Sequence, residues 1–488
     1  MCRSARLRVE ALETRWLLSA TPSLTWVPND PQFGVQYALN NTGQSGAKTD
    51  VDINAPEGWR VVNIARTTVG VVDTGIDYTH PDLYSNIWIN QAEIPSAIRS
   101  KLLDLDRDGR ISFRDLNDTR NQGTGKITDL NRNGYIDAGD ILKPLSQGGW
   151  ADGVDAGRNG YVDDLVGWNF VTNTNNPFDD QGHGSHISGT IGAIGNNGVG
   201  TAGVAWNVQL MALKTFDSKG VSDTRWLTQA IDYATNNGAR VVNASWVLSS
   251  PSSTLTAAID RAAAKNVVIV ASAGNNARNI DANPVYPAGN KSKNVLTVAS
   301  VDNQGRLSTF SNYGEGTVHI AAPGNNIYST NSWGRYGNRS GTSMATGFVT
   351  GAAALVTGLR PEWNYRNVID QILNNVRELS SLQGKVASGG MLDLSKAVRV
   401  PARPQTPPPF NGVKLSEVQL SSVPDTLNPV IQPSQVTVIG NLSNQGAKVE
   451  ARADQVTSAA AWLDTWRIGR RAHWSLLTSQ HLTPPGEA

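Results

Sequence analysis

The sequence contains one cysteine, Cys2, among 488 residues. An intramolecular disulfide is therefore impossible, and a zinc or iron–sulfur site built from several cysteines is excluded. Lys and Arg number 42 against 41 Asp and Glu, so the formal charge of +1 creates no general field that attracts nucleic acid or an anionic membrane. The longest mainly apolar stretches, 267–273 and 345–356, are shorter than the roughly 18 residues of a membrane span. The sequence thus predicts neither a nucleic-acid partner nor a transmembrane segment.

The N-terminal end of the chain differs in character from its middle. Residues 1–22 begin with several arginines, but charged residues interrupt the apolar core that an ordinary signal peptide needs. Their segment LETRWLLSA nevertheless resembles a short N-terminal sorting tag of exported bacterial proteins. We therefore interpret 1–22 as a sorting segment and expect a secreted or cell-surface protein. The alternative is an intracellular protein whose N-terminal segment carries no address.

A proline-rich stretch marks a domain boundary near residue 400. Five prolines lie in VPARPQTPPPFNG (400–412), a composition that favours an extended linker over a packed element. The sequence thus predicts a main domain at 23–400, a linker at 401–412 and a C-terminal segment at 413–488. The last of these contains a tryptophan-rich stretch, which is more typical of a hydrophobic core than of a binding surface. The sequence assigns this segment no function.

The middle of the chain alternates short apolar runs with helical stretches. Continuous apolar strands separated by helices indicate a parallel sheet that is covered on both faces, so the predicted fold class is α/β, doubly wound and mostly parallel. Ligands bind beyond the carboxyl ends of the strands in such sheets. The expected strands lie at 67–75, 208–216, 239–247 and 266–275, and the expected helices at 223–237 and 253–265.

Three residues of complementary chemistry fall at the ends of these expected elements. Asp73 closes an apolar strand and is followed by a turn, and His183 lies between two glycines just before a tightly packed helix. Ser343 begins an Ala/Gly-rich helix, whose N-terminal dipole favours developing negative charge. Each residue alone has an ordinary structural explanation, such as a helix cap. Together they provide the nucleophile, base and orienting carboxylate that nucleophilic catalysis needs.

The order Asp, His, Ser along the chain is that of subtilisin, and four segments carry the resemblance: VVDTGIDYTHPDL, GHGSHISGTIGA, ASAGNN and GTSMA. These motifs are similar to the signature segments of the subtilisin-like serine peptidases. The resemblance implies a serine endopeptidase that acts on polypeptides through an acyl-enzyme, with Asp73, His183 and Ser343 as its triad. It further implies an oxyanion-hole donor at Asn275 and a substrate-binding edge that includes Ser245, Trp246, Val247 and Gly274.

The sequence departs from the family pattern at three points. Gly347 stands where proline is usual after the nucleophile, which we expect to loosen the positioning of Ser343. Val247 stands where glycine is usual on the substrate-binding edge, so we expect a narrower substrate range or lower activity. The residues before the resemblance begins are too few for a folded prodomain, so maturation is expected to differ. A non-catalytic surface or adhesion protein on the same scaffold is therefore the alternative function.

Two twelve-residue segments between Asp73 and His183 match a calcium-binding loop. DLDRDGRISFRD (104–115) and DLNRNGYIDAGD (129–140) carry oxygen ligands at positions 1, 3 and 5, glycine at position 6 and a carboxylate at position 12. We expect an inserted pair of EF-hand-like or dockerin-like loops at 101–165 that staple a disulfide-free protein with Ca²⁺. The predicted ligands are Asp104, Asp106, Asp108, Arg110 (backbone) and Asp115 in the first loop, and Asp129, Asn131, Asn133, Tyr135 (backbone) and Asp140 in the second.

Two further candidate calcium sites rest on the family resemblance. AGRNGYVDDLVGWNF resembles a family calcium segment, although its spacing is irregular, and a second site is implied elsewhere. The alternative is that all these acidic turns are merely solvated. Ca²⁺ is the predicted cofactor, polypeptides are the predicted partners, and a monomer is the expected state. The residues concerned are Asn159, Asp163 and Asp164 in the irregular segment, and Asp30, Asp82 and Asn197 in the other site.

Overall fold

The computed structural model of the chain describes residues 26–62, 66–401, 438–441 and 448–451. The chain divides into two units, 1–403 and 404–488. The predicted sorting segment and nearly all of the predicted linker and tail lie outside the described residues. Within the second unit, two described strands pair antiparallel, β12 (Val438–Asn441) and β13 (Lys448–Ala451).

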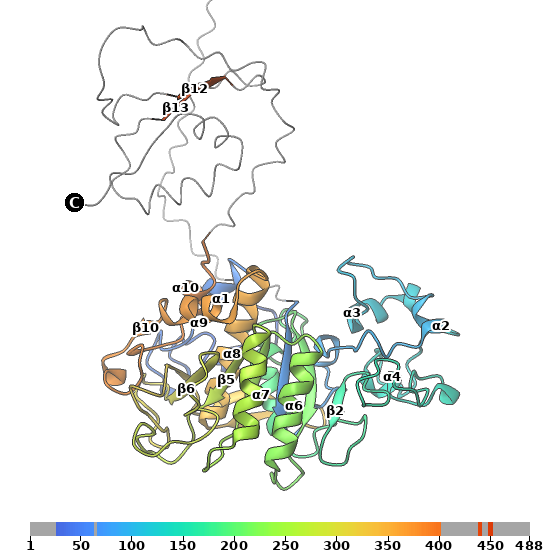
Figure 1. The fold of residues 1–488 in the computed structure, drawn as a ribbon, viewed down its shortest axis with the longest axis horizontal. Helices are drawn as coiled ribbons and strands as arrows, with labels where there is room; N and C mark the ends of the chain where they lie inside the picture. The colour runs from blue at the N-terminus through green and yellow to red at the C-terminus, as the bar shows by residue number, and fades with distance from the viewer. Residues whose placement is uncertain (1–25, 63–65, 402–437, 442–447, 452–488) are drawn as a thin grey trace, which may run out of the picture. The chain divides into compact units, whose positions relative to one another are not determined.

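A nine-stranded sheet lies at the centre of the described part of the first unit (Figure 1). Its order is β10-β11-β7-β6-β5-β4-β1-β3-β2, and every neighbouring pair is parallel except β10 with β11. The predicted α/β fold with a mostly parallel sheet is thereby confirmed. The strands are β1 (Thr68–Asp73), β2 (Gly167–Asn169), β3 (Gln209–Lys214), β4 (Val241–Ala244), β5 (Val268–Ser272), β6 (Val295–Val301), β7 (Ile320–Pro323), β10 (Arg377–Glu378) and β11 (Gly390–Met391).

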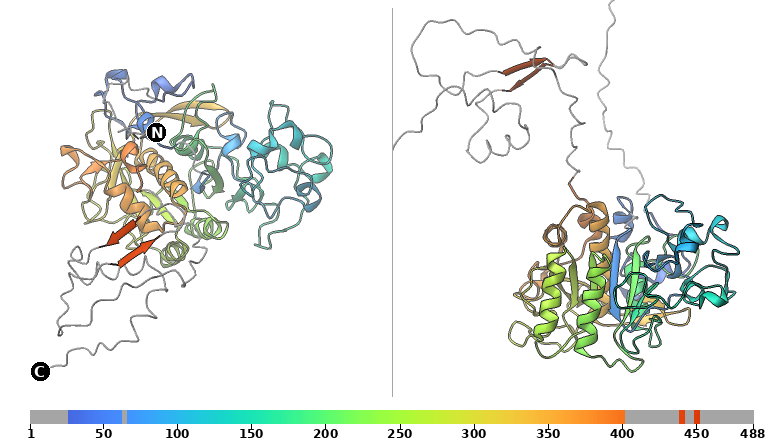
Figure 2. Two further views of the ribbon diagram at one scale, coloured as in Figure 1. Left: turned by 90° about the horizontal axis from the view of Figure 1, so that it is seen from above. Right: turned by 45° about the vertical axis from the view of Figure 1, so that its right-hand side comes forward.

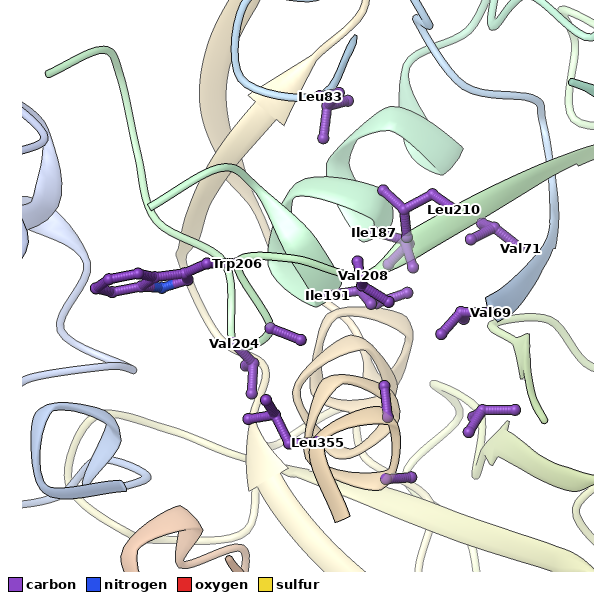
Figure 3. Close-up of a cluster of buried hydrophobic side chains, with 14 of the residues drawn as sticks. Val69, Val71, Leu83, Ile187, Ile191, Val204, Trp206, Val208, Leu210 and Leu355 are labelled. Carbon is purple, nitrogen blue, oxygen red and sulfur yellow. The ribbon is translucent and has the colours of Figure 1, made fainter. Parts of the chain in front are cut away.

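Helices cover both faces of the sheet because its strands are apolar on both sides. Val69 and Val71 of β1 belong to the same hydrophobic cluster as α5 (His183–Gly192) and α8 (Thr342–Leu359). Val72, on the opposite face, belongs to the cluster of α6 (Thr224–Asn236) and α7 (Ser253–Ala264). Figures 1 and 2 show α6 and α7 side by side along one face. Figure 3 shows the other cluster, with side chains from β1, α5 and α8 packed together.

Helix α8 is apolar because it lies in the core. Among the described residues it is the one helix that is long and apolar enough to cross a bilayer, with a mean hydropathy of 1.3 over 18 residues. The same window is 89% buried inside the protein. The helix contacts β4, β5, β6 and β7 of the sheet. Packing against the sheet therefore accounts for its composition, and its length and hydropathy alone are weak evidence for a membrane span.

The predicted insertion forms a lobe of short helices beside the sheet, coloured cyan to teal in Figures 1 and 2. Its helices are α2 (Ser96–Arg99), α3 (Phe113–Leu116) and α4 (Ala138–Ile141). Phe113, Trp150 and several isoleucines of this lobe are fully buried and join the main core. The lobe is therefore packed onto the domain and consists mainly of loops.

The remaining described elements complete the unit. The hairpin of β8 (Ile327–Asn331) and β9 (Arg335–Arg339) contacts α5 through β8 and leads directly into α8. The others are η1 (Phe33–Val35), η2 (Gln44–Gly46), α1 (Ala55–Trp59), η3 (Tyr84–Asn86), η4 (Thr119–Asn121), η5 (Leu145–Gln147), α9 (Tyr365–Leu373), η6 (Ser380–Leu382) and α10 (Leu394–Ala397).

Candidate active site

Asp73 and His183 meet because two elements end and begin at the same edge of the sheet. β1 ends at Asp73, and α5 begins at His183. His183 Nδ1 lies 2.6 Å from Asp73 Oδ1, and the Asp73 side chain is only 2% exposed. Burial alone would lower the pKa of His183, but the charge and hydrogen bond of Asp73 outweigh it and raise the pKa above the ordinary value of 6.5. The carboxylate thus orients the imidazole and stabilises its protonated form.

Ser343 is the second residue of α8 and is 8% exposed. Its Oγ donates a hydrogen bond to the carbonyl of Ser245 at 2.9 Å. Ser245 Oγ in turn donates to the carbonyl of Ser343 at 3.1 Å. Within the described residues, no hydrogen bond joins Ser343 to His183, a common state of catalytic pairs without substrate. In this state the hydroxyl hydrogen of Ser343 is therefore directed at the Ser245 carbonyl.

Asn275 is held with its amide nitrogen free to donate. The residue is exposed and follows β5. Its Oδ1 accepts from the N–H of Thr342 and from Thr342 Oγ1, both at 2.9 Å. Because the carbonyl end is engaged, Nδ2 is the end left to bind a ligand. Ser343 supplies a second donor, since the first N–H groups of a helix have no partner within it. Two such donors can stabilise an oxyanion.

The predicted substrate-binding edge follows β4. Ser245 and Trp246 are buried, whereas Val247 is 37% exposed. In the described part of the chain, no hydrogen bond engages the backbone N–H or carbonyl of Val247. A Cβ on Gly274 would lie 3.5 Å from Val247 Cγ1, so the two residues face each other across a narrow gap. The backbone of Val247 is therefore open to strand pairing, and its side chain narrows the space beside this edge.

Asp179 is a site residue that the sequence interpretation missed. Burial alone would raise its pKa, but hydrogen bonds outweigh burial and lower it. The sequence feature that could have indicated this role is an acidic residue shortly before a histidine at the start of a helix. This position is also typical of helix caps. The carboxylate ties the segment of His183 to that of Asp73 by accepting hydrogen bonds of 2.7 to 2.9 Å from Thr74 Oγ1, from Ser185 Oγ and from the N–H groups of Gln181, Gly182 and Ser185.

Buried side chains link the remaining segments of the site, and the sequence interpretation missed these too. Lys214 Nζ donates to the carbonyl of Thr74 at 2.7 Å and to Asp180 at 2.8 Å, so it joins the chain after Asp73 to the chain before His183. Asn243 Nδ2 donates to Ser245 Oγ at 2.8 Å, and its Oδ1 accepts from Thr350 of α8. The segments that carry Asp73, His183 and Ser343 are thus cross-linked by polar groups.

Gly347 lies where α8 approaches α5. The helix runs without a break from Thr342 to Leu359, and Gly347 is buried. A Cβ at this position would lie 3.0 Å from Thr190 Cγ2 of α5. The absence of a side chain therefore permits the close approach of the helices that carry Ser343 and His183. The expected looser positioning of Ser343 stays a prediction.

The two loops predicted to bind calcium, 104–115 and 129–140, share one backbone conformation. Position 4 has a positive φ in both, 59° and 61°, and the glycine at position 6 has φ of 86° and 98°. Asp104 accepts from the N–H groups of positions 5 and 6 at 3.2 and 2.7 Å. Asp129 does the same at 3.2 and 2.9 Å. The predicted backbone ligands Arg110 and Tyr135 follow the glycines, and each donates its N–H to the position-5 side chain.

The carboxylates at position 12 turn back into their loops. Asp115 and Asp140 are the third residues of α3 and α4 and accept from N–H groups of their own loops, at 2.9 and 2.7 Å for Leu105 and Leu130. In the first loop, Asp104, Asp106 and Asp108 offer oxygen atoms that all lie within 4.8 Å of one another. Arg66 pairs with the last two of these at 3.1 and 3.5 Å. In the second loop, Asn131 and Asn133 donate to Asp137.

A third loop repeats this arrangement. Asp155 accepts from the N–H groups of Asn159 and Gly160 at 3.0 and 2.8 Å, and Arg158 has φ of 53°. The sequence interpretation named Asn159, Asp163 and Asp164 but missed Asp155, because Gly157 stands where the third ligand is expected. Asp155 therefore occupies the place of position 1.

The residues of the other implied calcium site are brought together. Asn197 donates from Nδ2 to Asp82 Oδ1 at 3.0 Å and from its N–H to Asp30 Oδ1 at 3.1 Å. Burial raises the pKa of Asp82 to about 6, although hydrogen bonds from Thr201 and Asn197 act against it. Two buried carboxylates at one place favour a bound cation.

Comparison with known proteins agrees with the four motifs. Residues 65–392 match the Subtilase family. Subtilisin-like protease 1 of Plasmodium berghei is 29% identical over 76% of this chain, and the chain spans 54% of that protein. A thermophilic serine proteinase of Bacillus sp. is 30% identical over 75% of this chain and 68% of its own. A solved protease structure from Pseudoalteromonas arctica has a TM-score of 0.50 and 26% identity, over 76% of this chain and 98% of its own. The chain belongs to the subtilase family.

Proposed function

We propose that this protein is a serine endopeptidase that hydrolyses peptide bonds through an acyl-enzyme. The observation that carries the proposal is the 2.6 Å contact between Asp73 Oδ1 and His183 Nδ1, beside the helix start that bears Ser343. Membership of the subtilase family supports the activity, as do the similar proteins, whose names describe proteases.

The chemistry follows from the positions of the polar atoms. Ser343 Oγ attacks the carbonyl carbon of the substrate while His183 Nε2 takes the hydroxyl proton. The carbonyl π electrons move to oxygen, and the oxyanion accepts hydrogen bonds from Asn275 Nδ2 and the Ser343 N–H. His183 then gives its proton to the leaving amine as the C–N bond breaks, which leaves an ester on Ser343. Water, activated by the same imidazole, cleaves this ester and restores the hydroxyl. Asp73 stabilises the imidazolium in both halves of the reaction.

The substrate is an extended polypeptide that pairs with the open edge at 245–247. Main-chain hydrogen bonds to this edge would hold a strand whatever its side chains. Val247 and Gly274 flank the space beside the edge, and the valine methyl groups occupy room that a glycine would leave. We therefore expect a preference for small side chains on the acyl side of the cleaved bond.

Labelling with a fluorophosphonate tests the activity, because this reagent reacts with a serine only when a base activates it. The full-length protein in calcium should acquire one label on Ser343 and cleave casein. Ser343→Ala should lose both, whereas Ser253→Ala, an exposed serine at the start of α7, should lose neither. A folded wild-type protein that takes up no label would refute the proposal.

We propose further that Ca²⁺ staples the insertion lobe and the site of Asp30, Asp82 and Asn197. The donors fit this ion, since they are carboxylate, amide and backbone oxygens in loops of matching geometry. In the first loop, Asp104, Asp106, Asp108 and the Arg110 carbonyl would hold the ion. Bound calcium would offset the repulsion among clustered carboxylates and stabilise the folded state by mass action.

Isothermal titration calorimetry on chelator-treated protein tests the calcium proposal. Asp104→Ala and Asp129→Ala should each remove one bound ion, and the wild-type Tm should fall when calcium is chelated. Asp232→Asn, which affects only an exposed pair with Arg261, is the matched control. Equal stoichiometry in all these proteins would contradict the assignment of the loops.

We propose that the protein is exported, on the resemblance of residues 1–22 to a sorting tag. Millimolar extracellular calcium would suit even weak loops. N-terminal sequencing of the protein from the culture medium and from cell fractions tests this, and an intact N-terminus found only inside cells would contradict it.

A further inference from the structure

Arg339 places a guanidinium beside the catalytic histidine. It is the last residue of β9, half-buried, and lies four positions before Ser343. Its Nη2 donates to the carbonyl of Gln181 and to Asn331 Oδ1, both at 3.3 Å. A Cβ on Gly182 would lie 2.8 Å from the same nitrogen, so the guanidinium packs over the residue that precedes His183.

No carboxylate pairs with Arg339 in the described part of the chain, and those of the adjoining segments are engaged elsewhere. Asp73 is bonded to His183, Asp180 pairs with Lys214, and Asp179 accepts hydrogen bonds from its own loop. Arg339 also lies at the N-terminus of α5, where the helix dipole disfavours a cation. Its guanidinium is therefore left without an ion-pair partner among the described residues, although the negative charges of Asp73 and Asp179 lie close by.

The charge of Arg339 also acts on the reaction itself. Burial lowers the pKa of His183, and Asp73 raises it. The positive charge of Arg339 also lowers this pKa. The imidazole becomes a cation when it takes the proton of Ser343, so a second cation nearby opposes that step. A negative charge that arrived with the substrate would offset this opposition.

The position of Arg339 indicates which part of the substrate it meets. The carbonyl of Ser245 accepts from Ser343 Oγ, so the edge that binds the acyl part lies on one side of the nucleophile. His183 delivers its proton to the leaving amine, so the part after the cleaved bond lies on the imidazole side. Arg339 contacts Gln181, in the segment that leads into His183, and thus lies on this second side.

We propose that Arg339 selects substrates that carry Asp or Glu within the first three residues after the cleaved bond. Nη2 alone is engaged within the described residues, which leaves the N–H groups of Nη1 and of Nε able to donate charge-assisted hydrogen bonds to a substrate carboxylate. The substrate carboxylate would also offset the cation beside His183, so the preference extends from binding to turnover. This inference rests on the proposed peptidase activity.

Matched peptides test the preference. Three pairs of fluorogenic peptides would carry Glu or Gln at the first, second or third position after the cleaved bond. With the full-length protein in calcium, kcat/KM should favour Glu about tenfold at one position at least, as charge-assisted hydrogen bonds are roughly twice as strong as neutral ones. Arg339→Gln should abolish the preference. Arg335→Gln, an exposed arginine at the other end of β9, should keep it.

Two further measurements distinguish failure of this inference from failure of the proposed peptidase activity. Ser343→Ala protein should bind the favoured Glu peptide more tightly than its Gln partner, whether or not the wild type cleaves either. For a neutral peptide, Arg339→Gln should raise the midpoint of the pH profile of kcat/KM, because a cation near His183 is removed. The carboxylates of Asp73 and Asp179, which also act on His183, stay in place. Equal kcat/KM for Glu and Gln at all three positions, equal binding by Ser343→Ala, or a preference that survives Arg339→Gln would overturn the inference.

Discussion

Replacement of Asp179 by Asn tests how the histidine segment is held. The carboxylate accepts three hydrogen bonds on Oδ1 and two on Oδ2, the latter from the N–H and Oγ of Ser185. Asparagine keeps one oxygen and replaces the other with an NH2 group, which cannot accept a hydrogen bond. With the NH2 group at the position of Oδ2, both hydrogen bonds that Ser185 donates to this atom are lost. At about 1.5 to 3 kcal/mol per hydrogen bond to a charged acceptor, the free energy of unfolding should fall by about 3 to 6 kcal/mol. A shift of the imidazole by about 1 Å would lower kcat/KM about 10²-fold.

The assay combines urea unfolding in calcium with kcat/KM on one fluorogenic peptide. Because the pKa of Asp179 is lowered in the fold, its stabilisation is fully present above the ordinary value of 3.8 and is lost as pH falls through the lowered pKa. The difference between wild type and variant should therefore be constant near neutral pH and shrink in acid. Asp232→Asn breaks only an exposed ion pair and should cost about 1 kcal/mol or less. A loss in Asp179→Asn no larger than in this control, with full activity, would refute the reasoning.

Four further expectations follow from the same geometry. Asn275→Ala should lower kcat about 10² to 10³-fold with KM nearly unchanged, as measured by steady-state kinetics. Since His183 must be neutral to act and its pKa is raised, kcat/KM should rise with pH through a midpoint above 6.5, and a lower midpoint would contradict the Asp73 contact. Chelation of calcium should lower the Tm measured by differential scanning calorimetry, and this fall in Tm should be smaller in Asp104→Ala than in the wild type. Gly347→Ala should lower kcat more than it raises KM, because the new Cβ would meet Thr190 at 3.0 Å and shift α8 from α5.

The fold was predictable because its strands are buried on both faces. The stretch 67–75 contains β1, observed at Thr68–Asp73, and all six residues of this strand are buried. The predicted helices at 223–237 and 253–265 match α6 and α7 to within one residue at each end. Both helices begin after capping residues, Asp223 and Ser252, which the structure shows bonded to first-turn N–H groups. An apolar run and a capping residue act locally, so they can be interpreted from a single sequence.

The residues that hold the site together were not predictable, because their partners are distant in the sequence. Asp179 lies 105 positions from Thr74, and Lys214 lies 140 positions from the same residue. A buried aspartate near a helix start has the ordinary interpretation of a cap, and a lysine at the end of a strand has that of a solvated charge. Only the tertiary structure shows that both tie the segment of Asp73 to that of His183.

Beside these cross-links, the packing of α8 against α5 brings Ser343 and His183 near each other. Asp179 and Lys214 join the Asp73 and His183 segments, and Ser245 joins Ser343 to the substrate-binding edge. Within the described residues no hydrogen bond joins Ser343 directly to His183, so the packing of α8 on α5 contributes to their separation, as does the bond from Arg339 to the Gln181 carbonyl. Gly347 lies at this contact, where a Cβ would lie 3.0 Å from Thr190. On the proposed mechanism, we expect the packing of this helix pair to influence the step in which the hydroxyl proton moves to the imidazole, and Gly347 permits the two helices to approach closely.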